Sequence, residues 1–137
     1  MAGTVIADRL EAASTSQLVI ENGVALTPPT IVDVNNVQIG TFCRAWVNFN
    51  GTGTVAIRAS FNVSSITDNG TGDYTVNLTT AMPDTNYAVN VSCNGPVVQL
   101  INIKNGGTYS TSAIQVFAFG SNSSAFDQSI ICVSVFR

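Results

Sequence analysis

The stretch ITDNGTGDYTVNLTTAMPDTNYAV, residues 66–89, places three turn signals around two runs of alternating apolar residues. The apolar residues of the first run alternate with polar ones and share one face of a strand: Tyr74, Val76 and Leu78. Before this run, Gly70 and Gly72 accept the left-handed backbone conformations that a tight turn requires. After Pro83 the alternation resumes. The stretch therefore predicts a β-meander, whose neighbouring strands pair antiparallel.

The segments on either side of this stretch have the same character. Upstream, a strand is expected after the Asn50–Gly53 turn, with four residues on one face: Val55, Ile57, Ala59 and Phe61. Downstream, residues 97–103, 113–119 and 129–136 are apolar on both faces, which is typical of central strands or of strands covered by another subunit. We expect an all-β protein whose body is an antiparallel, jelly-roll-like β-sandwich.

The first 40 residues differ from the rest and are interpreted as an extended N-terminal β arm. Residues 7–14 contain helix formers sufficient for one short turn, and Asn22-Gly23 is the preferred pair for a tight hairpin. Pro28-Pro29 then stiffens the chain into an extended conformation. The expected domains are an arm at residues 1–40, which provides attachment and oligomer contacts, and a β-sandwich body at residues 41–137.

Composition limits the partners that the protein is expected to have. Charged residues make up only 9% of the chain, against roughly 25% in typical soluble domains, and the mean hydropathy is +0.30. Some surface is therefore expected to be covered by other subunits, and the alternative is an ordinary secreted β domain. The five Lys and Arg residues form no cluster, which argues against nucleic-acid binding. No apolar run approaches the length of a membrane span, and the N-terminus lacks the pattern of a secretory signal.

The residue types argue against catalysis. The chain has no histidine, which excludes Ser-His-Asp and Cys-His catalysis and the commonest transition-metal ligand. Its three cysteines, Cys43, Cys93 and Cys132, lie far apart in apolar contexts and are expected to be free thiols. We expect no catalytic residue, no metal site and no cofactor.

Four aspartates are candidates for functional groups: Asp68, Asp73, Asp84 and Asp127. Paired carboxylates support glycoside hydrolysis, and the sequence from Asp68 to Asp73 superficially resembles a calcium loop. That loop lacks the bidentate glutamate of an EF-hand. Each aspartate stands within two residues of Gly, Asn, Pro or Ser, where its side chain commonly binds turn amides, so a structural role is preferred.

Aromatic and apolar residues supply the remaining candidates. Tyr109 and Phe126 lie in apparent loops and are the two candidates for contact with a ligand such as a glycan. Five strand residues are candidates for the core or for contacts between subunits: Trp46, Val98, Leu100, Phe117 and Phe119.

Residues 44–89 resemble a module of tail-fibre and other virion structural proteins of tailed bacteriophages. The resemblance is carried by AWVNFNGTGTVAIRAS at residues 45–60, NVSSITDNGTGDYTV at residues 62–76 and TTAMPDTNYAV at residues 79–89. It covers about a third of the chain. Long fibres carry coiled coils or repeats that this chain lacks, which favours a head decoration protein, a short head fibre or a small tail appendage.

The resemblance implies a non-enzymatic virion surface protein, commonly a homotrimer, that is assembled in the bacterial host cytoplasm. Its expected partners are capsid or tail proteins, which it contacts through the N-terminal arm. The alternative is a receptor-binding module of a tail fibre, which recognises a host-surface glycan. No nucleic-acid or membrane partner is expected.

Overall fold

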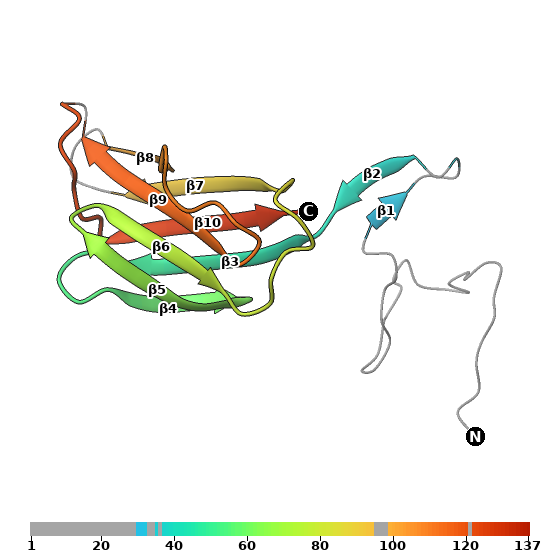
Figure 1. Cartoon of the computed structure of the whole chain (residues 1–137), viewed down its shortest axis with the longest axis horizontal. Helices are drawn as coiled ribbons and strands as arrows, with labels where there is room; N and C mark the ends of the chain where they lie inside the picture. Colours follow the sequence, from blue (N-terminus) through green and yellow to red (C-terminus); the bar gives the residue numbers. More distant parts are fainter. Residues whose placement is uncertain (1–29, 33–34, 36, 95–98, 121) are drawn as a thin grey trace, which may run out of the picture.

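The computed structural model describes residues 30–32, 35, 37–94, 99–120 and 122–137, and this part of the chain contains strands and no helix (Figure 1). The short turn expected at residues 7–14, the Asn22-Gly23 hairpin, the Pro28-Pro29 segment and Val98 lie outside the described residues.

Two antiparallel sheets of four strands each form the body. In spatial order, sheet I contains β4 (Ala56–Phe61), β3 (Cys43–Asn50), β10 (Ile130–Phe136) and β7 (Ala88–Asn94). Sheet II contains β5 (Val63–Gly70), β6 (Asp73–Leu78), β9 (Ala113–Gly120) and β8 (Gln99–Ile103). The sheets face each other across an apolar core, so the expected all-β sandwich is confirmed.

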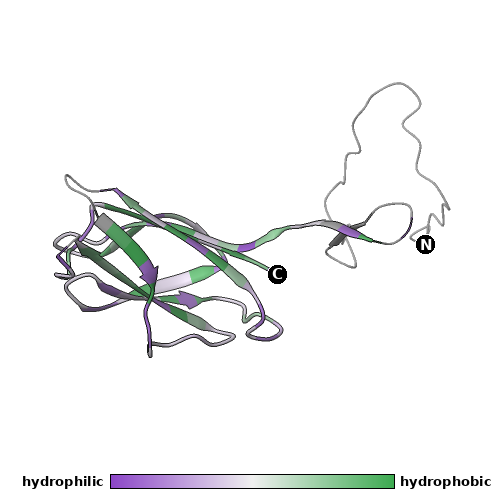
Figure 2. Cartoon of the chain, turned by 90° about the horizontal axis from the view of Figure 1, so that it is seen from above, coloured by the Kyte–Doolittle hydropathy of each residue, from purple (hydrophilic) through white to green (hydrophobic). Residues whose placement is uncertain are grey.

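The core follows from the alternation of residues along the strands. Every second residue of β6 is buried, at Tyr74, Val76 and Leu78, as the sequence predicted. Strands β3, β9 and β10 alternate in the same way and supply further buried side chains: Ala45, Val47, Phe49, Ile114, Val116, Ala118, Ile131, Val133 and Val135. Figure 2 shows hydrophobic residues along the strands and hydrophilic ones in many connecting loops.

The predicted meander is correct for its first hairpin and wrong for its third strand. Strands β5 and β6 pair antiparallel through a turn at Thr71 and Gly72. Strand β7, however, pairs with β10 in sheet I, so the chain crosses between the sheets after β6. The crossing segment is anchored by buried Met82, whose backbone N–H donates to the carbonyl of Thr111. A strand with one apolar face fits either sheet, and its alternation does not say which.

Of the three segments that are apolar on both faces, two are central strands. Strand β9 lies between β6 and β8, and β10 lies between β3 and β7. Strand β8 is instead at the edge of sheet II, where Leu100 is 48% exposed. All three cysteines are free thiols, as predicted.

Strand β4 departs from the expected alternation. Ala59 and Phe61 pair with outward-facing residues of β3, but a register shift between Asn48 and Phe49 leaves Arg58 as an extra residue. Ile57 then pairs with the buried Phe49, so it does not share a face with Ala59 and Phe61. The prediction that these residues lie on one face is wrong because a bulge resets the alternation.

The described part of the N-terminal region is a two-stranded ribbon of β1 (Thr30–Val32) and β2 (Gln38–Thr41). In Figure 1 it lies beyond one end of the sandwich, at the end where β10 reaches the C-terminus. The hydroxyl of Thr41 donates a hydrogen bond of 2.8 Å to the backbone carbonyl of Arg137. We call this end of the sandwich the arm end and the opposite one the loop end.

At the loop end, the buried hydroxyl of Tyr74 joins three connections. It donates to the Asp127 carboxylate at 2.6 Å and lies 3.0 Å from the carbonyl oxygen of Gly51. The same Asp127 oxygen accepts the backbone N–H of Gly72 at 2.8 Å. Gly72 has a φ of 71°, and a Cβ there would lie 2.3 Å from the carbonyl oxygen of Ala118. Only glycine fits this position.

This geometry predicts a contrast between Gly72→Ala and Gly53→Ala. Gly53 also has a positive φ, of 63°, but a Cβ there meets nothing within 4 Å. Gly53→Ala should cost about 1 kcal/mol of unfolding free energy through backbone strain alone. Gly72→Ala should cost about 3 kcal/mol or more of unfolding free energy, because the new Cβ would also clash with the backbone carbonyl oxygen of Ala118. Urea denaturation of both variants measures the difference, and equal losses would contradict this account of the loop end.

Candidate functional site

The outer face of sheet II combines a polar cluster with an apolar hollow. Because Tyr74, Val76 and Ala118 point into the core, the residues between them on β6 and β9 point outward. The outward positions are Asp73, Thr75 and Asn77 on β6, and Gln115, Phe117 and Phe119 on β9.

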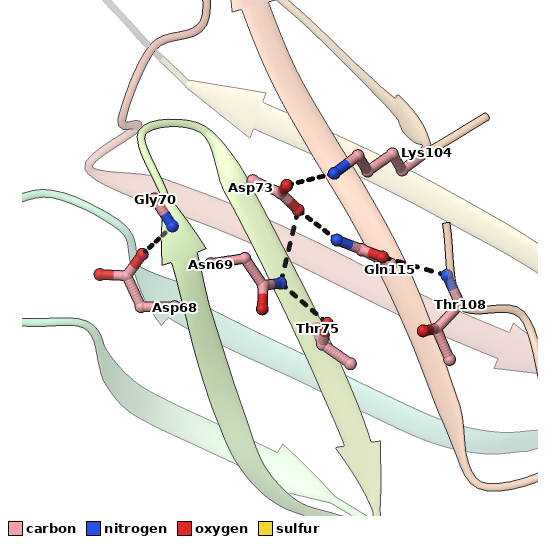
Figure 3. Close-up of polar contacts among 8 residues, drawn as sticks. All are labelled: Asp68, Asn69, Gly70, Asp73, Thr75, Lys104, Thr108 and Gln115. Carbon is pink, nitrogen blue, oxygen red and sulfur yellow. Dashed lines mark hydrogen bonds and ion pairs between the residues drawn. The ribbon is translucent and has the colours of Figure 1, made fainter. Parts of the chain in front are cut away.

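Asp73 is the centre of the polar cluster (Figure 3). Its carboxylate accepts hydrogen bonds from the ammonium of Lys104, from Gln115 at 2.7 Å and from Asn69 at 3.4 Å. Burial alone would raise the pKa of the Asp73 carboxyl, but these hydrogen bonds outweigh it and lower the pKa below its ordinary value. The side chains of Lys104 and Asp73 are 36% and 13% exposed. The Asp73 carboxylate is thus ionised, and the pair is largely fixed in place.

Gln115 links this cluster to the loop that follows β8. Its amide nitrogen donates to Asp73, and its amide oxygen accepts the backbone N–H of Thr108 at 3.0 Å (Figure 3). The backbone N–H of Lys104 donates to the carbonyl of Gln115 at 2.9 Å. The end of β8 and its following loop are therefore held against β9.

The apolar hollow lies beside this cluster. The rings of Phe117 and Phe119 are stacked, with centroids 5.9 Å apart and planes inclined by 22°. Leu100 pairs with Phe119 and Asn102 pairs with Phe117 across β8 and β9. The hollow measures about 340 Å³, and its lining comprises Asn102, Ile103, Lys104, Asn105, Phe117 and Phe119. Its size and mixed lining suit a small ligand.

Sequence reasoning found the apolar half of this site and missed the polar half. Leu100, Phe117 and Phe119 were predicted as core or subunit-contact residues, and they lie on the outer face of sheet II. Asp73 was assigned to a turn, and Lys104, Asn102 and Asn105 were not singled out. The sequence did contain a clue to Asp73. It directly precedes Tyr74, and because neighbouring residues of a strand point to opposite faces, an inward Tyr74 places Asp73 on the outer face.

Trp46, the other described candidate for subunit contact, lies on the outer face of sheet I. It is 40% exposed and pairs with Phe61 of β4, which is 55% exposed. Phe61 and the 43% exposed Phe42 line a second hollow, of about 490 Å³, at the start of β3. The described candidates for subunit contact therefore divide between two opposite faces of the sandwich.

The two predicted ligand-contact residues lie far apart. Tyr109 belongs to the β8–β9 connection, where its ring stacks on Tyr87 with centroids 4.6 Å apart, and its hydroxyl donates to the carbonyl of Tyr87 at 2.7 Å. This ring packs against the core. Phe126 lies at the loop end and is 40% exposed. The structure does not bring the two residues together into one site.

The four aspartates do not converge either. Asp68 accepts the backbone N–H of Gly70, Asp84 accepts that of Asn86, and Asp127 accepts that of Gly72. Asp84 also forms a bidentate ion pair with Arg137 at the arm end. Three of the four thus bind turn amides, as expected. Among the described residues, no group of three or more His, Cys, Asp or Glu side chains could hold a metal ion.

No protein-family model, curated protein or solved structure matches this chain. Within the described ranges, no helix is long and apolar enough to cross a membrane.

The three tyrosines of the chain should all resist ionisation while the protein is folded. Burial raises the pKa of Tyr87 to about 12, and it also raises the pKa of Tyr109 and Tyr74 above the ordinary value of 10. The unfolded chain then loses these protons first, so stability is full below pH 10 and falls as pH rises through 10 towards 12.

Ultraviolet titration of phenolate, with circular dichroism recorded on the same samples, tests this prediction. In concentrated urea the tyrosines should ionise near the ordinary pKa. In buffer, phenolate should appear at higher pH and together with unfolding. A tyrosine that ionises at its ordinary pKa in the intact fold would contradict the packing described for these residues.

Proposed function

We propose that this protein is a non-enzymatic virion surface protein of a tailed bacteriophage, attached through its N-terminal arm as a capsid decoration or short fibre protein. The observation that carries the proposal is that the two ends of the sandwich differ. The ribbon β1–β2 and the C-terminus lie at the arm end, whereas residues 51–55, 71–72 and 122–129 connect strands at the loop end (Figure 1). If the arm end is attached to the particle, the loop end of the sandwich faces away from the particle.

The loop end is suited to exposure outside a particle because several of its polar side chains are bound within the chain, although the side-chain amide of buried Gln128 has no hydrogen-bond partner among the described residues. The Asn50 side chain donates to the carbonyls of Thr52 and Thr54 and accepts the Thr52 hydroxyl at 2.8 Å. Asp127 fastens the β9–β10 connection to Tyr74 and Gly72. Such loops stay ordered without a partner, and their low charge gives weak long-range attraction to other macromolecules.

The attachment function is assigned to residues 1–40, which bind a capsid or tail protein by strand addition or as an extended clamp. An isolated two-stranded ribbon is marginally stable in water, which is consistent with the packing of β1–β2 on a partner in the particle. The copies associate as a homotrimer in this proposal. Trp46, Phe42 and Phe61 supply exposed apolar surface next to the arm for that association.

The proposal is tested on gradient-purified virions of the phage that carries this sequence. Mass spectrometry should detect the chain in the particle fraction at many copies per particle. Because the chain has only five Lys and Arg residues, digestion with chymotrypsin should accompany trypsin. Absence of the chain from intact particles would overturn the proposal.

Light scattering on the purified full chain tests the trimer separately. The expected native mass is three times the 14.3 kDa of one chain. A stable monomer would remove the trimer from the proposal while leaving attachment to the particle open to the first experiment.

A further inference from the structure

We infer that the hollow beside the Asp73 cluster is a binding site for a neutral saccharide, held between β8 and β9. This inference goes beyond the structural role proposed above and does not depend on it. It also differs from a glycan site at Tyr109 and Phe126, which lie apart, because its residues come from paired strands of one sheet.

Two side-chain amides in the hollow are available to a ligand. Asn102 and Asn105 are exposed, and within the described part of the chain neither side chain has a hydrogen-bond partner. Three other asparagines of the sandwich are engaged: Asn50 binds its own loop, Asn69 binds Asp73, and Asn77 binds Ser65 and Thr67. Each amide carries two donors and an acceptor, which matches the adjacent hydroxyls of a sugar ring.

The charge of the hollow favours a neutral ligand. Among the described residues that line it, Lys104 alone is ionisable, and its ammonium is paired with Asp73. Gln115 and Asn69 hold that carboxylate in place, so the charge of Lys104 is compensated before any ligand arrives. An anionic ligand would have to compete with Asp73. The spare N–H groups of Lys104 remain able to donate to a neutral hydroxyl oxygen.

The apolar part of the lining suits the C–H faces of a sugar. Phe117 and Phe119 are half-buried on the central strand β9, whereas Ile103 is 38% exposed. A ligand that covers these side chains removes apolar surface from water while its hydroxyls reach the asparagines. The volume of about 340 Å³ is at the small end of ligand sites, as expected for a short oligosaccharide.

The test uses the full chain on an array of neutral mono- and oligosaccharides of glucose, galactose, mannose and N-acetylglucosamine, with uronic-acid and sialic-acid oligosaccharides as the charged contrast. Any neutral binder is then titrated by calorimetry and by amide NMR. We expect shifts of the Asn102 and Asn105 side-chain amides. The double variant Asn102→Ala, Asn105→Ala should bind about tenfold more weakly or worse, because two hydrogen-bonding groups are lost.

Asn90→Ala is the matched control, because Asn90 is an exposed strand asparagine on sheet I. It should bind as tightly as the unaltered chain, and all variants should keep the same Tm because the substituted side chains are exposed. Three results would overturn the inference: no neutral saccharide binds at millimolar concentration, charged saccharides bind more tightly, or the double variant binds as the control does. None of these results bears on whether virions contain the protein.

Discussion

The hydroxyl of Tyr74 is the contact on which the geometry of the loop end depends. The ring is fully buried and meets Phe49 of the opposite sheet edge-on, with centroids 5.3 Å apart. Its hydroxyl then needs a polar partner inside the protein, because a buried hydroxyl without a hydrogen bond is costly. Asp127 and the Gly51 carbonyl supply that partner from two different connections. One aromatic residue therefore contacts the opposite sheet through its ring and holds two connections at the loop end through its hydroxyl.

This arrangement explains why glycines stand where they do at the loop end. A Cβ on Gly51 would lie 2.5 Å from the Tyr74 hydroxyl oxygen, and a Cβ on Gly72 would meet the backbone of Ala118. Both residues are glycine because the chain passes close to a neighbouring group. Gly70 and Gly53 differ, since a Cβ on either would meet nothing within 4 Å and their positive φ values alone favour glycine.

The sequence was sufficient to predict local structure and insufficient to predict which strands pair across the body. Alternation identified the buried face of β6 correctly, because a strand with one apolar face leaves little choice of side. The same alternation did not reveal that β7 joins sheet I, because its partner β10 is distant in sequence. It also did not reveal the bulge at Arg58, which arises from a register shift against the neighbouring strand β3. The polar cluster around Asp73 was missed because it, too, depends on residues distant in sequence. Its main partners, Lys104 and Gln115, lie 31 and 42 residues away.

The ion pair of Lys104 and Asp73 has two effects that converge on the proposed saccharide site. Lys104 follows β8 and Asp73 begins β6, so the pair spans β9 and ties the edge strand to the middle of sheet II. A ligand that touches Asn102 on β8 and Phe117 on β9 needs those two strands to keep their relative positions. The same pair compensates the charge of the hollow's lysine. In a chain with so few charged residues, this one ion pair holds β8 and β9 in position. It also neutralises the charge of Lys104, which favours a neutral ligand in the proposed site.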